Sequence, residues 1–116
     1  MGVREAKYRL EKWRIKKYES KGKKLSPETE AKMSKVFTQQ VALETTIKMI
    51  LDKIGVSTTT YGAYIGFGRE IYGLRRRHSG DELNKRTETV MAKWLDRKLD
   101  KTILGKIKKN TYSISV

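Results

Sequence analysis

Apolar residues recur at steps of three and four along most of the chain, which is the spacing of amphipathic α-helices. The longest stripe consists of Met33, Val36, Gln40, Leu43, Ile47, Ile50 and Ile54. Ser26 suits the N-cap of this helix, Pro27 its first position and Gly55 its C-cap. We therefore predict a main core helix ending near Ile54, in which the weak helix formers Thr45 and Thr46 introduce a bend or an interruption.

A thinner apolar seam comes before this helix. It consists of Val3, Ala6, Leu10 and Trp13, and most other positions up to Ser20 are charged. We predict a basic helix over residues 3–20, followed by the mobile basic connector Lys21-Gly22-Lys23-Lys24.

Residues 61–74 combine aromatic residues at helical spacing with four glycines. Each glycine weakens a helix by about 1 kcal/mol relative to alanine, so we predict a helix whose glycine face packs closely on another segment. Gly62 and Gly66 form a small-xxx-small pair, and we expect helix packing or self-association from them. A nucleotide loop at residues 66–68 is disfavoured, because no strand precedes it.

Two shorter helices are expected after this one. Ser79 and Glu82 fit a capping box, ahead of a buried stripe of Leu83, Val90, Met91, Trp94 and Leu95. Asp100 suits the cap of a fifth helix that buries Ile103, Leu104 and Ile107. Residues 112–116 alternate between polar and apolar side chains, which is typical of a strand that pairs with a neighbour; the alternative is a frayed tail.

These elements predict an all-α fold, a four- to five-helix bundle with an extended basic N-terminal helical arm. A chain of 116 residues is long enough for one compact core and too short for two of ordinary size. We therefore expect an arm at 1–24, a helical bundle at 25–110 and a tail at 111–116.

Charge identifies the expected partner. The chain has 27 Lys and Arg against 13 Asp and Glu, a net charge of +14, and residues 1–24 hold ten of these cations and three of these anions. Cations at this density suit phosphates, and the interleaved Tyr8, Trp13 and Tyr18 suit sugars or bases. A merely solvated face usually mixes both signs. A membrane partner is disfavoured because the apolar seam is narrow, whereas an acidic protein remains an alternative.

A second basic patch is expected at Arg75-Arg76-Arg77, with Arg69 before it and Lys85-Arg86 after it. Cations also stabilise a helix C-terminus, which explains part of this run without a ligand. The candidate nucleic-acid-binding residues are Arg4, Lys7, Arg9, Lys12, Trp13, Arg14, Lys16, Lys17, Lys21, Lys23, Lys24, Arg69, Arg75, Arg76 and Arg77.

Catalytic chemistry is not expected. The chain has no cysteine, and its one histidine, His78, follows three arginines at a helix end, where capping is the simpler role. The carboxylates suit caps and surface pairs, and no nucleophile–base pair or metal-ligand set can be assembled. We therefore predict a non-enzyme with no catalytic residues, metal, cofactor or small-molecule substrate. The absence of a leader or a membrane-length apolar run favours the cytoplasm.

The order of these features resembles the major capsid proteins of rod-shaped and filamentous archaeal viruses, of the rudivirus and lipothrixvirus type. The resemblance rests on Lys12-Trp13, Ile54-Gly55-Val56 with Ser57-Thr58, Tyr61-Gly62-x-Tyr64-x-Gly66, Gly80, Trp94 and Asp100-x-x-Ile103-Leu104-x-x-Ile107. It covers about residues 4–107. It implies an N-terminal arm that wraps double-stranded DNA in A-form and a helical bundle that builds the wall of the virion.

The expected function is therefore that of a structural nucleoprotein, present in the virion and the host cytoplasm. It packages double-stranded DNA with little sequence specificity and self-associates as a dimer or a helical filament. The alternative is a small cellular DNA- or RNA-binding helical module, such as a regulator or a chromatin- or ribosome-associated protein. The high charge and the glutamates at positions 5, 11 and 19 leave that alternative open.

Overall fold

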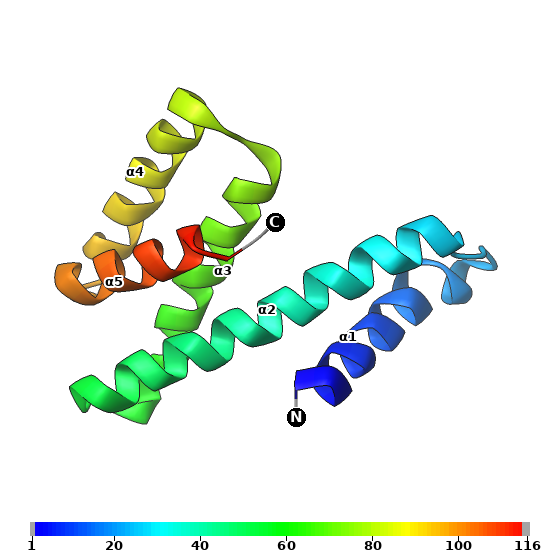
Figure 1. The fold of residues 1–116 in the computed structure, drawn as a ribbon, viewed down its shortest axis with the longest axis horizontal. Coiled ribbons are helices and arrows are strands. Elements are labelled where there is room, and N and C mark those ends of the chain that lie inside the picture. Colours follow the sequence, from blue (N-terminus) through cyan, green and yellow to red (C-terminus); the bar gives the residue numbers. More distant parts are fainter. Residues whose placement is uncertain (1, 115–116) are drawn as a thin grey trace. The chain divides into compact units, whose positions relative to one another are not determined.

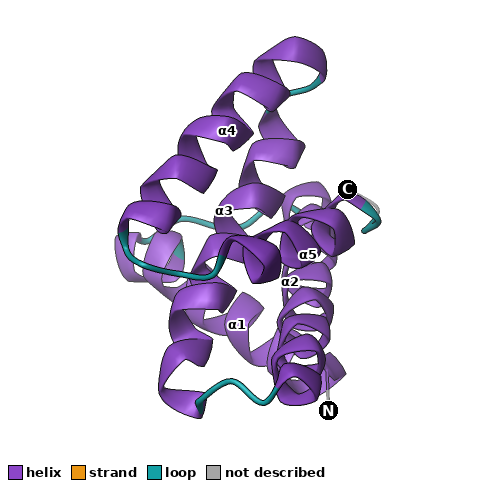
Figure 2. Ribbon diagram, turned by 90° about the vertical axis from the view of Figure 1, so that its left-hand side faces the viewer, coloured by secondary structure: helices purple, strands orange, loops and turns teal. Residues whose placement is uncertain are grey.

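Five α-helices dominate the computed structural model, which describes residues 2–114 and the side chains from Arg4 onwards. Among these residues no strand occurs, and turns join the helices (Figure 2). The prediction of an all-α fold with five helices is confirmed. The helices are α1 (Gly2–Lys17), α2 (Pro27–Ile54), α3 (Tyr61–Arg77), α4 (Gly80–Asp96) and α5 (Lys101–Tyr112), with the short 3-10 helices η1 (Glu19–Lys21) and η2 (Thr58–Thr60) before α2 and α3 (Figure 1).

The chain divides into two compact units, Met1–Ala42 and Leu43–Val116. The boundary falls inside α2, which is continuous from Pro27 to Ile54. The expected arm, residues 1–24, therefore shares a unit with the first half of α2. The expected division fell after residue 24, whereas the observed division falls after Ala42. The two differ because α1 packs on the first half of α2.

In the first unit, α1 runs beside the first part of α2 (Figure 1). Ala6 from α1 and Val36 from α2 are its buried apolar side chains, 5% and 6% exposed. The Trp13 ring meets Phe37 of α2 edge-on, with 6.3 Å between centroids. The apolar seam predicted for the basic helix is thus the side that packs on α2. The side chain of Val3, which also belongs to the predicted seam, lies outside the described residues.

The ends of α2 follow the predicted signals. The Ser26 hydroxyl oxygen accepts the backbone N–H of Thr29 at 3.2 Å. Gly55 ends the helix with φ +83°, a conformation that glycine adopts without strain. The interruption expected at Thr45 and Thr46 does not occur. Burial of the apolar residues on either side outweighs the weak helix propensity of these threonines.

The core of the second unit lies between the second half of α2, α3 and α5. The buried stripe predicted on α2 is wrong near its end. Ile54, which was predicted to be buried, is 43% exposed, and Leu51, which was not in the predicted stripe, is fully buried. The residues of this core with no exposed surface include Leu43, Ile47, Leu51, Phe67, Ile71, Leu104 and Ile107.

Polar contacts also join α2 to α3 in this unit. Arg69 donates from Nη2 to Oε2 of Glu44 at 2.8 Å, and Glu44 is only 8% exposed. The Tyr61 hydroxyl donates to Oδ1 of Asp52, and this hydrogen bond raises the pKa of Tyr61. Each contact spans the η2 turn and fixes where α3 begins relative to the end of α2.

Two glycines of α3 pack closely, Gly66 of the predicted pair and Gly68, for which no packing role was predicted. A Cβ on Gly66 would lie 3.2 Å from Cη2 of Trp94, which confirms close packing there. A Cβ on Gly68 would clash with Cδ1 of Ile47. A Cβ on Gly62 would meet no other segment within 4 Å, so Gly62 has no close packing contact among the described residues, and its role in self-association stays a prediction.

The capping box predicted at the start of α4 is wrong. Ser79 lies at the N-cap position with an extended backbone but makes no side-chain capping hydrogen bond, and the next residue, Gly80, has φ +58°. On the buried side of α4, Trp94 is 6% exposed, as expected, and Thr87 is 2% exposed. The Thr87 hydroxyl lies 2.9 Å from that of Tyr112, so a polar residue joins the core with its hydrogen bond satisfied.

The start of α5 matches its prediction, and its end does not. Oδ1 of Asp100 accepts the N–H of Ile103 at 3.0 Å, the expected cap. The strand expected for residues 112–116 is wrong at 112–114, where Tyr112 ends α5 and a turn follows. Residues 115 and 116 lie outside the described residues. Packing of Thr111, which has no exposed surface, extends the helix past the predicted tail boundary.

Candidate nucleic-acid interface

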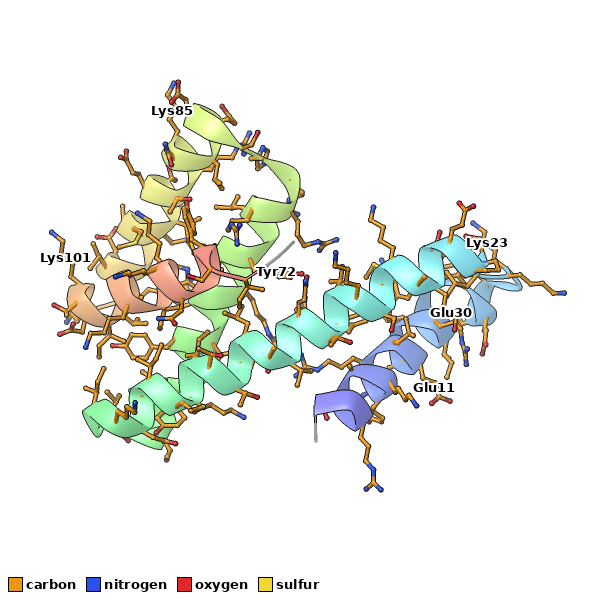
Figure 3. All side chains as sticks on the ribbon, viewed as in Figure 1. Glu11, Lys23, Glu30, Tyr72, Lys85 and Lys101 are labelled. Atoms are coloured by element: carbon orange, nitrogen blue, oxygen red, sulfur yellow. The ribbon has the colours of Figure 1, made fainter. Side chains whose placement is uncertain are left out.

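The outward side of α1 follows directly from its sequence. One face carries Ala6, Leu10 and Trp13 toward α2, so the remaining positions, almost all charged, lie in solvent. Tyr8 and Ile15 also lie on the outward side, 55% and 45% exposed. Figure 3 shows side chains projecting from α1 on the side away from α2.

Two cations of this helix are used within the unit. Arg9 pairs with Glu5 at 3.1 Å. Arg14 lies 3.2 Å from Glu19 and 3.9 Å from Glu30 of α2. These pairs hold two of the three glutamates of residues 1–24 against arginines, which reduces the repulsion that those carboxylates would exert on a phosphate backbone.

The other cations of residues 1–24 remain available to a ligand. Lys12 lies over the Tyr8 ring at 5.1 Å from its centroid, a contact that leaves its charge exposed. The rest are exposed and have no ion-pair partner among the described residues, and we call them the unpaired cations: Arg4, Lys7, Lys16, Lys17, Lys21, Lys23 and Lys24.

Trp13 has a structural role in addition to any contact with a ligand. Its ring meets Tyr18 at 5.4 Å between centroids and Phe37 at 6.3 Å, both edge-on. It is half-buried, so part of its surface remains accessible. Replacement of Trp13 would therefore disturb the hairpin of α1 and α2 as well as a binding surface.

In the second unit, two of the expected arginines hold the fold together. Arg69 pairs with the buried Glu44. Nη1 of Arg75 donates to the carbonyl oxygens of Thr111 and Ile114, at 2.6 Å each. The Arg75 guanidinium also lies over the Tyr112 ring, 5.3 Å from its centroid. Arg75 thus ties the end of α3 to the end of α5.

Arg76 and Arg77 are the exposed part of this patch. Arg76 lies over the Tyr72 ring at 6.0 Å. Burial raises the pKa of Tyr72, and the charges of Arg76 and Arg75 oppose that rise. The phenol stays neutral at physiological pH, so it adds no negative charge to the patch. Nearby, Arg86 pairs with Glu82 at 2.6 Å.

The lysines of α5 were not among the predicted site residues. Lys101, Lys106 and Lys109 are exposed, and Lys108 lies 5.8 Å from the centroid of the Tyr112 ring. The signal was present in the sequence as Lys106-Ile107-Lys108-Lys109, in which the isoleucine is buried and the lysines flank it. The exposed lysines of α5 and the exposed arginines at the end of α3 are solvent-accessible cations of the second unit.

Charge is shared equally between the units. Residues 1–42 have twelve Lys and Arg and five Asp and Glu, and residues 43–116 have fifteen and eight, so each carries +7. Residues 25–42 are neutral, which leaves the whole excess of the first unit on residues 1–24.

Metal clusters and membrane-spanning helices were sought in the part of the chain that is described. Residues 2–114 contain no cluster of three His, Asp or Glu side chains that could hold a metal ion. Among the same residues, no helix has both the length and the apolar character needed to cross a membrane. Comparisons with protein-family models, curated proteins and solved structures return no match.

Proposed function

We propose that this chain is a structural nucleoprotein that binds double-stranded DNA through its phosphates and assembles along it. The single observation that carries the proposal is the concentration of unpaired cations on residues 1–24, all exposed and in one helix and its connecting turn. Lysine and arginine neutralise phosphates and release counterions, which supplies most of the affinity of non-specific DNA binding.

The composition of this surface supports backbone contact over base recognition. Asn and Gln, which read adenine edges, are absent from residues 1–24, and two of the three arginines that could read guanine, Arg9 and Arg14, are paired with glutamates. Lysine and arginine in this density position a protein on DNA and carry little sequence information. The proposal therefore includes slight sequence specificity and no catalytic step.

Assembly along DNA is the finer part of the proposal and follows the resemblance to archaeal viral capsid proteins. Exposed cations on the other unit, Arg76, Arg77 and lysines of α5, support it, because cations on both units let one chain contact more than one stretch of backbone. The alternative is a small cellular nucleic-acid-binding module that acts as a monomer or a dimer.

Electron micrographs of the protein mixed with linear duplex DNA test this proposal. Filaments of uniform width along the DNA are expected, and light scattering should show large complexes that disappear at high salt. Small discrete complexes would favour the cellular module, and no complex at low salt would refute nucleic-acid binding. Duplex RNA in a parallel sample determines whether the surface distinguishes the two duplexes.

A further inference from the structure

A groove in the first unit lies where α1 ends and α2 begins. Its volume is about 470 Å³, and its lining residues are Trp13, Lys17, Tyr18, Lys23 and Met33. This volume falls within the range of small-molecule sites, roughly 300–1,000 Å³. Figure 3 labels Lys23 at the turn that leads into α2. Two aromatic rings, a thioether and two ammonium groups thus border one concave surface.

The charge around this groove favours an anion. No carboxylate is among its lining residues. The nearest acidic side chains on the same turn and helix start, Glu19 and Glu30, are held by Arg14 at 3.2 and 3.9 Å. Lys17 and Lys23 are exposed and have no ion-pair partner among the described residues. A phosphate between these two ammonium groups would meet no competing negative charge at the groove wall.

The aromatic rings of the groove favour a ligand with a planar, unsaturated group attached to that phosphate. Trp13 and Tyr18 meet at an interplanar angle of 61°, so a planar group that stacks on one ring presents its edge to the other. Met33 adds a polarizable sulfur, which makes favourable contacts with aromatic rings. Nucleobases stack on aromatic side chains in single-stranded binding sites, at roughly 1–3 kcal/mol for each base.

We propose that this groove receives one unstacked nucleotide of a nucleic-acid strand. The base lies against Trp13 and Tyr18, and the adjoining phosphate lies between Lys17 and Lys23. This inference rests on the proposed nucleic-acid function and adds a contact that a paired base inside an intact duplex cannot make. Strand ends, gaps and unpaired bases are therefore the preferred sites of the groove, with little preference among bases.

The test measures the affinity of the intact protein for three probes by fluorescence anisotropy and by tryptophan quenching. The probes are a short oligothymidylate, an abasic oligomer of the same length and free thymidine monophosphate. The oligothymidylate should bind roughly tenfold more tightly than the abasic strand, the factor expected for one stacked base. It should also quench tryptophan emission, which reports Trp13 because Trp94 is 6% exposed.

Met33→Phe fills the groove without changing charge, and Lys32→Gln, on the exposed side of the same helix, is the control for a substitution that removes one charge outside the groove lining. Met33→Phe should remove the tenfold preference and leave the affinity for the abasic strand unchanged, with helicity by circular dichroism as the check on folding. Lys32→Gln should keep the preference.

Four results would overturn the inference. Equal binding of the two strands by the natural protein is one, and a preference that survives in Met33→Phe is another. In both of these cases binding by charge, and so the proposed function, still stands. Quenching by free thymidine monophosphate at the concentration that suffices for the oligomer would instead assign the groove to free nucleotides. Failure to bind either strand would overturn the inference as well, and the affinity for an intact duplex, measured in parallel, decides the proposed function separately.

Discussion

Arg75 and Arg77 are two residues apart at the end of α3 and have different surroundings. Arg75 donates to two carbonyl oxygens near the end of α5, whereas Arg77 is exposed. A run of arginines in a sequence therefore contains both structural and available cations. Arg75 is structural because of a hydrogen-bond partner more than 30 residues away in the chain. The sequence around the arginines does not indicate such a distant partner.

Replacement of these two arginines should give opposite results. Arg75→Gln leaves the carbonyls of Thr111 and Ile114 without their donor, so we expect the free energy of unfolding to fall by about 1–3 kcal/mol. Arg77→Gln should change it by less than about 0.5 kcal/mol and weaken DNA binding instead. Urea denaturation and duplex affinity measure the two effects. Equal loss of stability in both variants would contradict the assignment.

Gly68 and Gly105 are both inside helices, and only Gly68 is in tight contact. In Gly68→Ala, the new Cβ would press on Ile47, which is fully buried, and overpacking costs about 1–3 kcal/mol. Gly105→Ala meets no described atom within 4 Å and should add about 1 kcal/mol through helix propensity. Thermal melts of the two variants check the signs. A more stable Gly68→Ala protein would contradict the close approach of α2 and α3.

At the scale of elements, the spacing of apolar residues predicted all five helices and most of their limits. Helical periodicity and caps such as Ser26 and Asp100 are local features, so they can be read from a short window. The apolar seam of α1 at Ala6, Leu10 and Trp13 was also predicted, whereas its packing on α2 was not, because an extended arm was expected. The strand expected after Thr111 was wrong, since tertiary burial extended α5 over an alternating pattern.

Contacts between elements could not be predicted in the same way. Gly62 and Gly66 form a recognisable pair, yet Gly66 and Gly68 are the ones in close contact, because packing depends on which face of α3 meets Trp94 and Ile47. The pairing of Arg9 and Arg14 with glutamates followed from helical spacing and from the return of α2. The groove at Trp13 joins residues from both helices, so no single segment of sequence indicates it.

The unpaired cations of α1 should account for the salt dependence of binding. Each cation that contacts a phosphate of duplex DNA contributes about 0.9 to the slope of log affinity against log salt. In a Lys7→Gln, Lys16→Gln double variant, the slope should therefore fall by almost 2. The matched control, Lys32→Gln with Lys35→Gln, removes the same charge from α2 and should leave the slope nearly unchanged. Equal slopes in the two double variants would refute the assignment of the phosphate contacts to α1.

At the scale of the whole molecule, each of the two units carries +7, and their boundary lies inside one continuous helix. A net charge this far from zero opposes self-association of the free protein, because copies repel one another. Phosphates would neutralise that repulsion. Assembly should therefore depend on DNA. Light scattering should show small species without DNA and large species with it. Large assemblies of the free protein at low salt would contradict this dependence.

The central claim is that the chain holds duplex DNA by its phosphates. The most direct test measures the affinity of the intact protein for two duplexes of unrelated sequence over a series of salt concentrations. Contact by most of the unpaired cations predicts a linear fall of log affinity with log salt, with a slope of about 4 to 6, and affinities for the two duplexes within about tenfold. A slope near zero, or a preference above about a hundredfold for one sequence, would contradict the claim.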